Sequence, residues 1–214
     1  MSVDANASRN LRFHLRAETQ GQHEALDSSF AALLPVPDIA AYNHFLRMNQ
    51  AAHGGVEAWL ATTPLAQWLP EWPEWSRLSD LEADMDVMGL APVSMPPFAL
   101  AESGLPEAVG VAYVLEGSRL GAVFIHRAFE KVGAPARLPG ASFRYLARSG
   151  EDKRFSRLAA RMDDLAFTKE ETERCVGAAR SAFDYFMKAR DDVASSADRL
   201  SLIHISEPTR LRRI

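Results

Sequence analysis

Apolar residues recur at helical spacing along almost the whole chain, and this pattern constrains the fold more than any other feature. No segment shows the convincing alternation of apolar and polar residues that a half-buried strand requires. The helical stretches are joined by short connectors, without an internal repeat or a long linker. At 214 residues the chain is long enough for one sizeable core and too short to require two. The sequence therefore predicts an all-α, single-domain, multi-helix bundle.

Local signals place the predicted helices along the chain. Asp38 can cap the second helix, and Gly54 and Gly55 are expected to bend or break it. Pro106 suits the first turn of a long helix that Gly133 ends. Residues 62–76, rich in Pro and Trp, are expected to form a packed connector with buried Trp68, Trp72 and Trp75. The helices are predicted over residues 8–30, 38–60, 79–88, 106–132, 153–165 and 168–189.

Two further helix starts carry capping-box spacing. Ser79 with Glu82 is expected to open the short helix that ends near residue 88, and Thr168 with Glu171 the last helix. The acidic run in the short helix is interpreted as a solvated face. That run consists of Asp80, Glu82, Asp84 and Asp86.

Composition narrows the class of protein. Apolar residues make up 47% and charged residues 24%, the usual balance of a soluble globular domain. The formal charge of −4 does not favour nucleic acid or an anionic membrane as the main partner. We find no apolar run near the ~20 residues that span a bilayer. The single cysteine, Cys175, excludes an internal disulfide and favours a reducing, cytoplasmic setting.

The two ends are set apart from the domain. Residues 1–8 are polar and are expected to form a disordered tail, and residues 9–190 to form the helical domain. The segment LSLIHISEPTR resembles the in-frame translation of a transposon adapter used in sequencing libraries. Residues 200–214 are therefore interpreted as an artefact tail, the alternative being a genuine tail that frays.

The predicted long helix contains Gly110, Gly117 and Gly121, each of which costs about 1 kcal/mol against alanine in a helix interior. Gly117 and Gly121 are one turn apart and expose the backbone on one face, with Ser118 and Ala122 beside them. Two explanations fit: close contact with another helix, which is common in bundles, or a flat rigid ligand.

His23, on the first predicted helix, lies near the face that Leu15 and Leu26 define. A lone histidine there is either a core residue or a ligand. Arg16 precedes it by two turns, about 10.5 Å along the axis. That separation suits an imidazole under a porphyrin iron and a cation at the propionate edge, although a surface charge is the simpler explanation of Arg16.

Three stretches resemble the heme oxygenase family. They are the motif LR…T…HE.LD in the first helix, YVLEGSRLGAVFI in the central one, and RMDDLAFTKEETERCVGAARSAF over residues 161–183. They run in the family's order from about residue 11 to 186, and EGS-x-LG-A is typical of the bacterial biliverdin-producing branch. The resemblance implies a heme oxygenase-type bundle in which heme is both cofactor and substrate. It implies conversion of heme to biliverdin, CO and ferrous iron with O2 and an external electron donor.

The resemblance also implies site residues. His23 stands at the proximal iron ligand, and Arg16 and Tyr113 at positions that contact propionates. Phe183 matches an aromatic residue at the heme edge, and Thr19 is counted with the heme-binding residues because it lies in the first motif. The distal catalytic segment, which also contacts heme, matches Gly117, Ser118 and Gly121.

The chain departs from the family at several positions. Ser118 stands where animal-type members carry an aspartate, and Ala122 replaces the second glycine of their pair. Proton delivery is therefore expected through ordered water held by backbone groups and Ser118. A basic propionate partner near Ala159 is missing, and one of three nearby arginines could substitute: Arg154, Arg157 or Arg161.

The implied partners are a ferredoxin or an NAD(P)H-dependent reductase, and a bilin-binding photoreceptor downstream. The chain has no Gly-rich phosphate loop for a nucleotide of its own. Three alternatives stay open: a heme-binding or heme-transfer protein without turnover, a non-heme helical enzyme, and an interaction module without a ligand. The non-heme enzyme would be a di-iron oxidase or a thiamin-degrading hydrolase, for which Cys175 is poorly placed.

The remaining polar candidates are interpreted as structural. His53 and Glu57 have a spacing that could hold a metal, but packing is favoured because no second such pair is in register. His14 and His44 are expected on the surface, and His126 in the core or at a rim. Glu116 is expected to cap a helix or to pair with an arginine.

Overall fold

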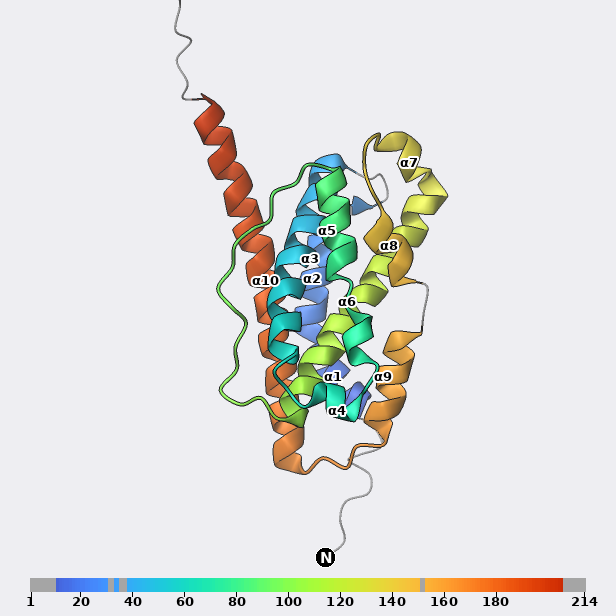
Figure 1. The fold of residues 1–214 in the computed structure, drawn as a ribbon, viewed down its shortest axis with the longest axis vertical. Helices are drawn as coiled ribbons and strands as arrows, with labels where there is room; N and C mark the ends of the chain where they lie inside the picture. Colours follow the sequence, from blue (N-terminus) through green and yellow to red (C-terminus); the bar gives the residue numbers. More distant parts are fainter. Residues whose placement is uncertain (1–10, 31–32, 35–37, 151–152, 206–214) are drawn as a thin grey trace, which may run out of the picture.

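The computed structural model describes residues 11–30, 33–34, 38–150 and 153–205, and from residue 197 onward only the backbone. Figure 1 shows the helices of this part packed into one bundle, with α6 running through its middle. The elements of the described residues are all helices, so the prediction of an all-α fold is confirmed. They are α1 (Leu11–Glu18), α2 (Gln20–Ser29), α3 (Ile39–Leu60), α4 (Leu65–Trp68), the 3-10 helix η3 (Trp72–Trp75), α5 (Leu78–Val87), α6 (Leu105–Val132), α7 (Ala134–Arg137), α8 (Arg144–Ser149), α9 (Arg154–Asp163) and α10 (Lys169–Ile205).

Helix α6 forms the centre of the bundle. Pro106 lies in its first turn, and Gly133 ends it with φ 65° and ψ 45°, a left-handed conformation that glycine adopts without steric cost. Its first half is buried and packs most extensively against α10. A Cβ at Gly110 would overlap the carbonyl oxygen of Cys175, so this glycine permits the close crossing of α6 and α10.

We found no apolar run near the length of a membrane span in the sequence, but by length and composition alone α6 is long and apolar enough to cross a membrane. However, 67% of its most apolar 18-residue window is buried inside the bundle. Since the core helix of a bundle passes the same test, this is weak support for a membrane span.

Two details of the first helices were predicted wrongly. The first helix is divided into α1 and α2 at Thr19, whose φ of −118° and ψ of 13° leave the helical region and whose hydroxyl donates to the carbonyl oxygen of Leu15 at 2.7 Å. In contrast, α3 runs without a break through Gly54 and Gly55. A Cβ at Gly55 would overlap the hydroxyl of Tyr185, so that glycine admits a side chain from α10.

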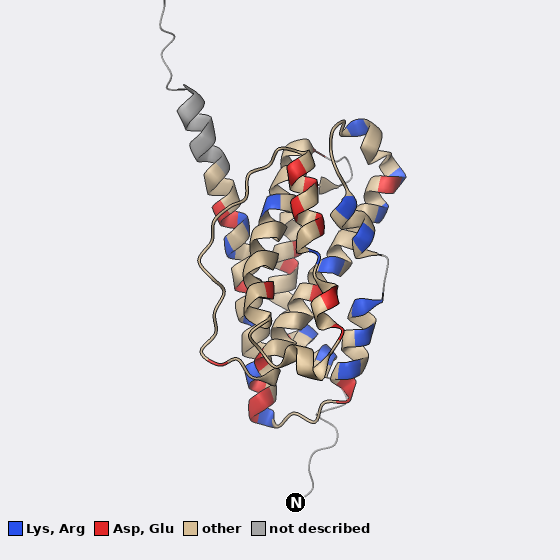
Figure 2. Cartoon of the chain, viewed as in Figure 1, with Lys and Arg blue, Asp and Glu red and all other residues tan. Residues whose placement is uncertain are grey.

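The acidic run on α5 is only partly solvated, which corrects the sequence interpretation. Asp80 and Asp84 are 1% and 0% exposed. One carboxylate oxygen of Asp84 accepts from the backbone N–H of Arg144 at 2.9 Å and the other from that of Tyr145 at 2.8 Å, so this side chain caps α8. Asp80 forms ion pairs with the side chains of Arg144 and Arg148 at 2.7 and 3.2 Å. In Figure 2 acidic residues accordingly follow α5, and arginines lie on the neighbouring α8.

Only one of the two predicted capping boxes forms. At the start of α10, Glu171 N–H donates to the Thr168 hydroxyl at 3.2 Å and Thr168 N–H to the Glu171 carboxylate at 2.8 Å. The box of Ser79 and Glu82 is wrong, because α5 begins before Ser79. A backbone N–H of its first turn donates to the hydroxyl of Ser76 instead, at 3.2 Å.

The connectors pack against the outside of the bundle. Trp72 and Trp75 are buried, as predicted for the connector that forms α4 and η3, and Trp68 is half-buried. Residues 88–104 run along the outside of the helices in Figure 1, and the Tyr185 hydroxyl donates to the carbonyl oxygen of Pro96 at 2.8 Å. The predicted tail of residues 1–8 lies outside the described residues. Of the suspected artefact segment, residues 200–205 continue α10 and residues 206–214 lie outside them.

Candidate functional site

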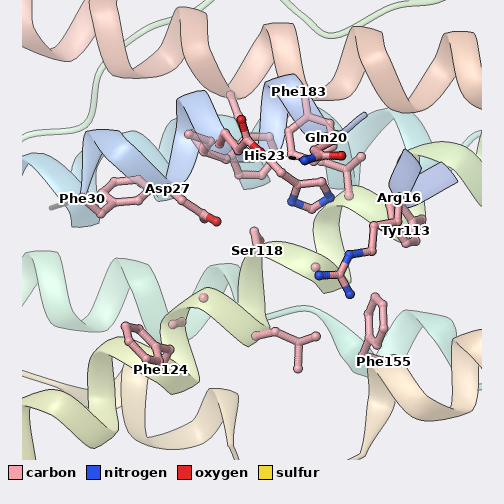
Figure 3. A pocket seen from close by; sticks show the side chains of 18 of the residues that line it. Arg16, Gln20, His23, Asp27, Phe30, Tyr113, Ser118, Phe124, Phe155 and Phe183 are labelled. Atoms are coloured by element: carbon pink, nitrogen blue, oxygen red, sulfur yellow. Dashed lines mark hydrogen bonds between the residues drawn. The ribbon is translucent and has the colours of Figure 1, made fainter. Parts of the chain in front are cut away.

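A cavity of about 1000 Å³ lies between the α1–α2 pair and the middle of α6, residues 113–125. This volume is at the upper end of the range of about 300–1,000 Å³ typical of ligand pockets. In Figure 3 the side chains of α2 face those of α6 across it, and α3, α9 and α10 complete the wall. Most lining residues are apolar. The predicted site residues among them are Arg16, His23, Tyr113, Gly117, Ser118, Gly121 and Phe183.

His23 projects from α2 into this cavity (Figure 3). Its Nε2 atom is buried and has no hydrogen-bond partner among the described residues. The ring centroid lies 4.5 Å from that of Phe183 and 6.2 Å from that of Tyr113, both in edge-on geometry. Burial lowers the pKa of His23 below its ordinary value, which Asp27 opposes and Arg16 reinforces. A neutral, buried imidazole nitrogen without a partner can ligate a metal.

The opposite wall is the open backbone of α6. A Cβ built at Gly117 or Gly121 would meet no atom within 4 Å, whereas one at Gly110 would overlap α10. The sequence allowed two explanations for these glycines: close contact with another helix, or space for a ligand. Close contact applies to Gly110, and open space to Gly117 and Gly121. Between the two open positions lies Ser118, whose hydroxyl donates to the carbonyl oxygen of Leu115 at 2.7 Å.

One end of the cavity is basic. Arg12 and Arg16 line it, and Figure 3 shows Arg16 close to Tyr113 and Phe155. Tyr113 is 4% exposed; burial raises the pKa of its hydroxyl, and the two arginines partly offset that effect. Guanidinium groups bind carboxylates in a bidentate manner, so this end can accept an acidic edge of a ligand. Sequence reasoning missed Arg12, although it lies one helical turn before Arg16.

The arginines suggested as replacements for the missing propionate partner do not line the cavity, so that suggestion is wrong. Arg154 and Arg161 donate to backbone carbonyl groups of the tryptophan connector, at 2.7 and 2.5 Å, and Arg157 is exposed. Their helix α9 contributes Phe155 to the cavity instead.

Other lining residues also differ from expectation. Thr19 is buried at the α1–α2 junction and is absent from the cavity wall. Phe13, Leu120 and Phe124 line the cavity while 56%, 50% and 65% exposed, which makes an apolar rim. Sequence reasoning missed this rim because its residues lie off the core-facing stripes of their helices. The sequence did contain a signal for this rim, because large apolar side chains stand at helix positions that were predicted to be exposed.

Behind Ser118 lies a buried polar cluster centred on His53, which is 0% exposed. Its Nδ1 lies 3.0 Å from Glu57, and its Nε2 lies 3.5 Å from the Ser118 hydroxyl and 3.4 Å from the Tyr145 hydroxyl. Burial lowers the pKa of His53. Burial also opposes ionisation of Glu57, but hydrogen bonds from His53 and Ser76 hold the pKa of that carboxyl below its ordinary value.

The other polar candidates lie outside the cavity wall. His14 is exposed, as predicted, whereas His44 is half-buried rather than on the open surface. His126 is half-buried, in keeping with a rim position. Glu116 pairs with Arg119 at 2.6 Å, so of the two roles predicted for it, pairing with an arginine is confirmed.

The fold and the cavity together define a class: an all-α protein with a pocket between a helix that carries a histidine and a helix that carries open glycines. The sequence model of the heme oxygenase family matches residues 99–192, which include α6 and most of α10. The structure matches crystal structures of the NO- and CO-bound heme oxygenase from Neisseria meningitidis with a TM-score of 0.65. That match has 22% sequence identity and covers 86% of this chain and 92% of the other. No curated protein sequence matches this chain.

These findings confirm the resemblance to the heme oxygenase family and the heme oxygenase fold. The bacterial branch is consistent with both findings.

Proposed function

We propose that this chain is a heme oxygenase of the bacterial biliverdin-producing type. It binds heme in the cavity between α2 and α6, with His23 Nε2 on the iron, and opens the ring to biliverdin, CO and ferrous iron. The observation that carries the proposal is the buried, unpartnered Nε2, which belongs to the cavity wall that faces the bare backbone of Gly117 and Gly121. O2 and an external electron donor are the other requirements.

The residues of the cavity fit heme. His23 is neutral because burial lowers its pKa, so its free nitrogen can coordinate iron without losing a proton. Arg12, Arg16 and the Tyr113 hydroxyl would hold the propionates, since they gather at one end of a mostly apolar pocket. Phe183 would pack beside the imidazole ring of His23, as the contact between these two side chains indicates.

When bound, heme supplies both the iron that binds O2 and the meso carbon that is oxidised. The chain's own contribution on the distal side is space and one small polar group. Gly117 and Gly121 let the ring approach the backbone of α6, and Ser118 holds a hydroxyl between them. The lining residues of α6 carry no ionisable acid or base other than the Tyr113 hydroxyl, so on this helix only a hydroxyl or bound water could deliver a proton.

The proposal also assigns partners and a setting. Electrons would come from a ferredoxin or an NAD(P)H-dependent reductase, because the sequence has no nucleotide loop of its own. The free, buried Cys175 suits a reducing cytoplasm. The product would leave for iron release or for a bilin-binding photoreceptor.

The test compares wild type with His23→Ala, and uses His14→Ala as the matched control because His14 is exposed and outside the cavity. Hemin is titrated into each protein, and each complex is then supplied with O2 and ascorbate or a reductase. Wild type and the control are expected to give a histidine-ligated ferric spectrum and a bilin detectable by chromatography. His23→Ala is expected to lose both, and added imidazole to restore the spectrum.

A variant His23→Ala that keeps the spectrum and turnover would show that the ligand is misassigned. A wild-type protein that binds hemin but keeps its Soret band under O2 and reductant would instead be a heme-binding or heme-transfer protein. A wild type that stays colourless with hemin would favour an interaction module.

A further inference from the structure

The mouth of the cavity carries large apolar side chains that are open to solvent. Phe13 of α1 and Leu120 and Phe124 of α6 line the cavity, yet each is at least half exposed. They are three of the five large apolar side chains that are exposed among the described residues. Because α1 and α6 form opposite walls, this apolar rim stands on both sides of the opening. Exposed apolar side chains that gather at one place mark a surface for a partner or a membrane.

Basic residues accompany the apolar rim on both walls. On α6, Arg127 and Lys131 are exposed and follow the two apolar residues of the rim at helical spacing, so all four share one stripe. On α1, the guanidinium carbon of Arg12 lies 4.5 Å from the centroid of the Phe13 ring. Each wall thus presents large apolar groups and a cation within one helical turn.

The neighbouring α9 extends this basic surface. It borders the cavity through Phe155 and holds three arginines and one aspartate. Figure 2 shows basic residues along α8, α9 and the end of α6, whereas acidic residues follow α5. Two carboxylates of α2, Glu24 and Asp27, also line the cavity, where the two arginines of α1 balance them. The surplus of positive charge therefore lies just outside the cavity wall, on α9 and the end of α6.

We propose that the cavity mouth docks on the surface of an anionic lipid bilayer. The apolar rim would enter the boundary between headgroups and acyl chains, and the basic residues around it would contact lipid phosphates. Apolar insertion combined with electrostatic attraction is what holds peripheral proteins at such a surface. The inference goes beyond the proposed function and meets it at one point: the cavity would open toward the medium in which a flat apolar ligand with two carboxylates collects.

The formal charge of −4 for the whole chain does not oppose this docking. At physiological ionic strength, charges more than about 8 Å from a surface are largely screened from it. Helix α5, which carries the acidic run, contributes no residue to the cavity wall. The local surplus of arginine and lysine around the mouth therefore decides the attraction, rather than the charge of the whole chain.

The shape of the opening favours a lipid surface over a folded protein. A stable protein interface buries about 800 Å² on each partner and packs apolar side chains at its centre. Here the centre is the cavity itself, so the exposed apolar side chains frame a hollow. Lipid headgroups and chains adapt to such an outline, whereas a rigid protein surface would leave the hollow unfilled.

The first test is sedimentation of the ligand-free protein with vesicles of phosphatidylcholine and phosphatidylglycerol in equal parts, or of phosphatidylcholine alone. Wild type is expected to sediment with the anionic vesicles and to stay in the supernatant with the neutral ones. Phe13→Ser/Phe124→Ser is expected to bind the anionic vesicles about tenfold more weakly, because two apolar rings no longer enter the interface. The control Ile39→Ser/Val87→Ser is expected to bind like wild type, because Ile39 and Val87 are 41% and 69% exposed but lie outside the cavity wall.

A second pair of variants tests the electrostatic part. Arg127→Gln/Lys131→Gln is also expected to weaken binding to the anionic vesicles by about tenfold, because each cation near an anionic surface contributes to the attraction. The control Lys169→Gln/Lys188→Gln removes the same charge at exposed positions of α10 and is expected to stay close to wild type.

A fluorophore identifies the face that enters the bilayer. The native Cys175 is buried, so a cysteine introduced at the surface is labelled selectively. Phe124→Cys labelled with nitrobenzoxadiazole is expected to brighten and to shift to shorter wavelength on addition of the anionic vesicles. Val87→Cys with the same label is expected to keep its aqueous spectrum.

A wild type that stays in the supernatant with the anionic vesicles would overturn the docking and leave the apolar rim to an acidic protein partner. Equal binding by the rim variants and their controls, or equal shifts of the two labels, would mean adsorption without a preferred face and would also overturn it. None of these measurements needs heme. A protein that docks on vesicles but binds no hemin would therefore refute the proposed function alone.

Discussion

The three glycines of α6 allow a quantitative test of the cavity. An alanine in a helix interior is about 1 kcal/mol more favourable than glycine. At Gly117 and Gly121 the added methyl group would meet nothing within 4 Å, so this gain is unopposed in the heme-free protein. The double variant is therefore expected to be about 2 kcal/mol more stable than wild type, which corresponds to a rise in Tm of about 4–8 °C for a chain of this size.

Gly110→Ala has the opposite sign and serves as the control. Its methyl group would overlap backbone atoms of α10, which cannot move as a flexible side chain can. The cost of such overpacking is typically about 1–3 kcal/mol. Urea unfolding of the heme-free proteins measures all three changes.

Stability and function should then separate in the double variant Gly117→Ala/Gly121→Ala. Its methyl groups would occupy the face against which heme is proposed to lie. Hemin affinity is expected to fall by about tenfold, or 1.4 kcal/mol, and bilin formation with it. A less stable double variant would refute the open backbone at these positions. A more stable one with unchanged hemin affinity and turnover would refute the position proposed for heme.

Two further predictions concern buried charges. Asp84→Asn is expected to lower the free energy of unfolding in urea by about 2–3 kcal/mol, because the amide cannot accept from both backbone N–H groups of α8. The control is the exposed Asp86→Asn, which should stay within about 0.5 kcal/mol of wild type. Equal free energies of unfolding for the two variants would contradict this prediction. Burial lowers the pKa of His53 in the folded state, so the unfolded chain binds more protons and stability falls as pH drops below about 6.5. His53→Gln is expected to reduce that slope in urea titrations at several pH values, although the lowered pKa values of His23 and His44 leave part of it. An unchanged slope would mean that His53 is not buried in its neutral form.

Helical period and local capping were sufficient to predict the fold class. The boundaries of α6 and the capping box of Thr168 and Glu171 follow from residues adjacent in sequence, whose hydrogen bonds form within one turn. The candidate site required more than pattern. His23 and the α6 glycines were identified through the resemblance to a family, since spacing alone favoured a core histidine and close packing.

What the sequence by itself determined is the set of helices and the residues that could hold heme; what only the tertiary structure decided is which faces those residues present to one another. Gly110 and Gly117 look alike in sequence, yet one faces a neighbouring helix and the other an open cavity. Asp84 looks like a solvated acid until α8, 60 residues later, brings its N-terminus to it. Contacts between distant segments depend on how the helices pack, and no local pattern encodes that arrangement.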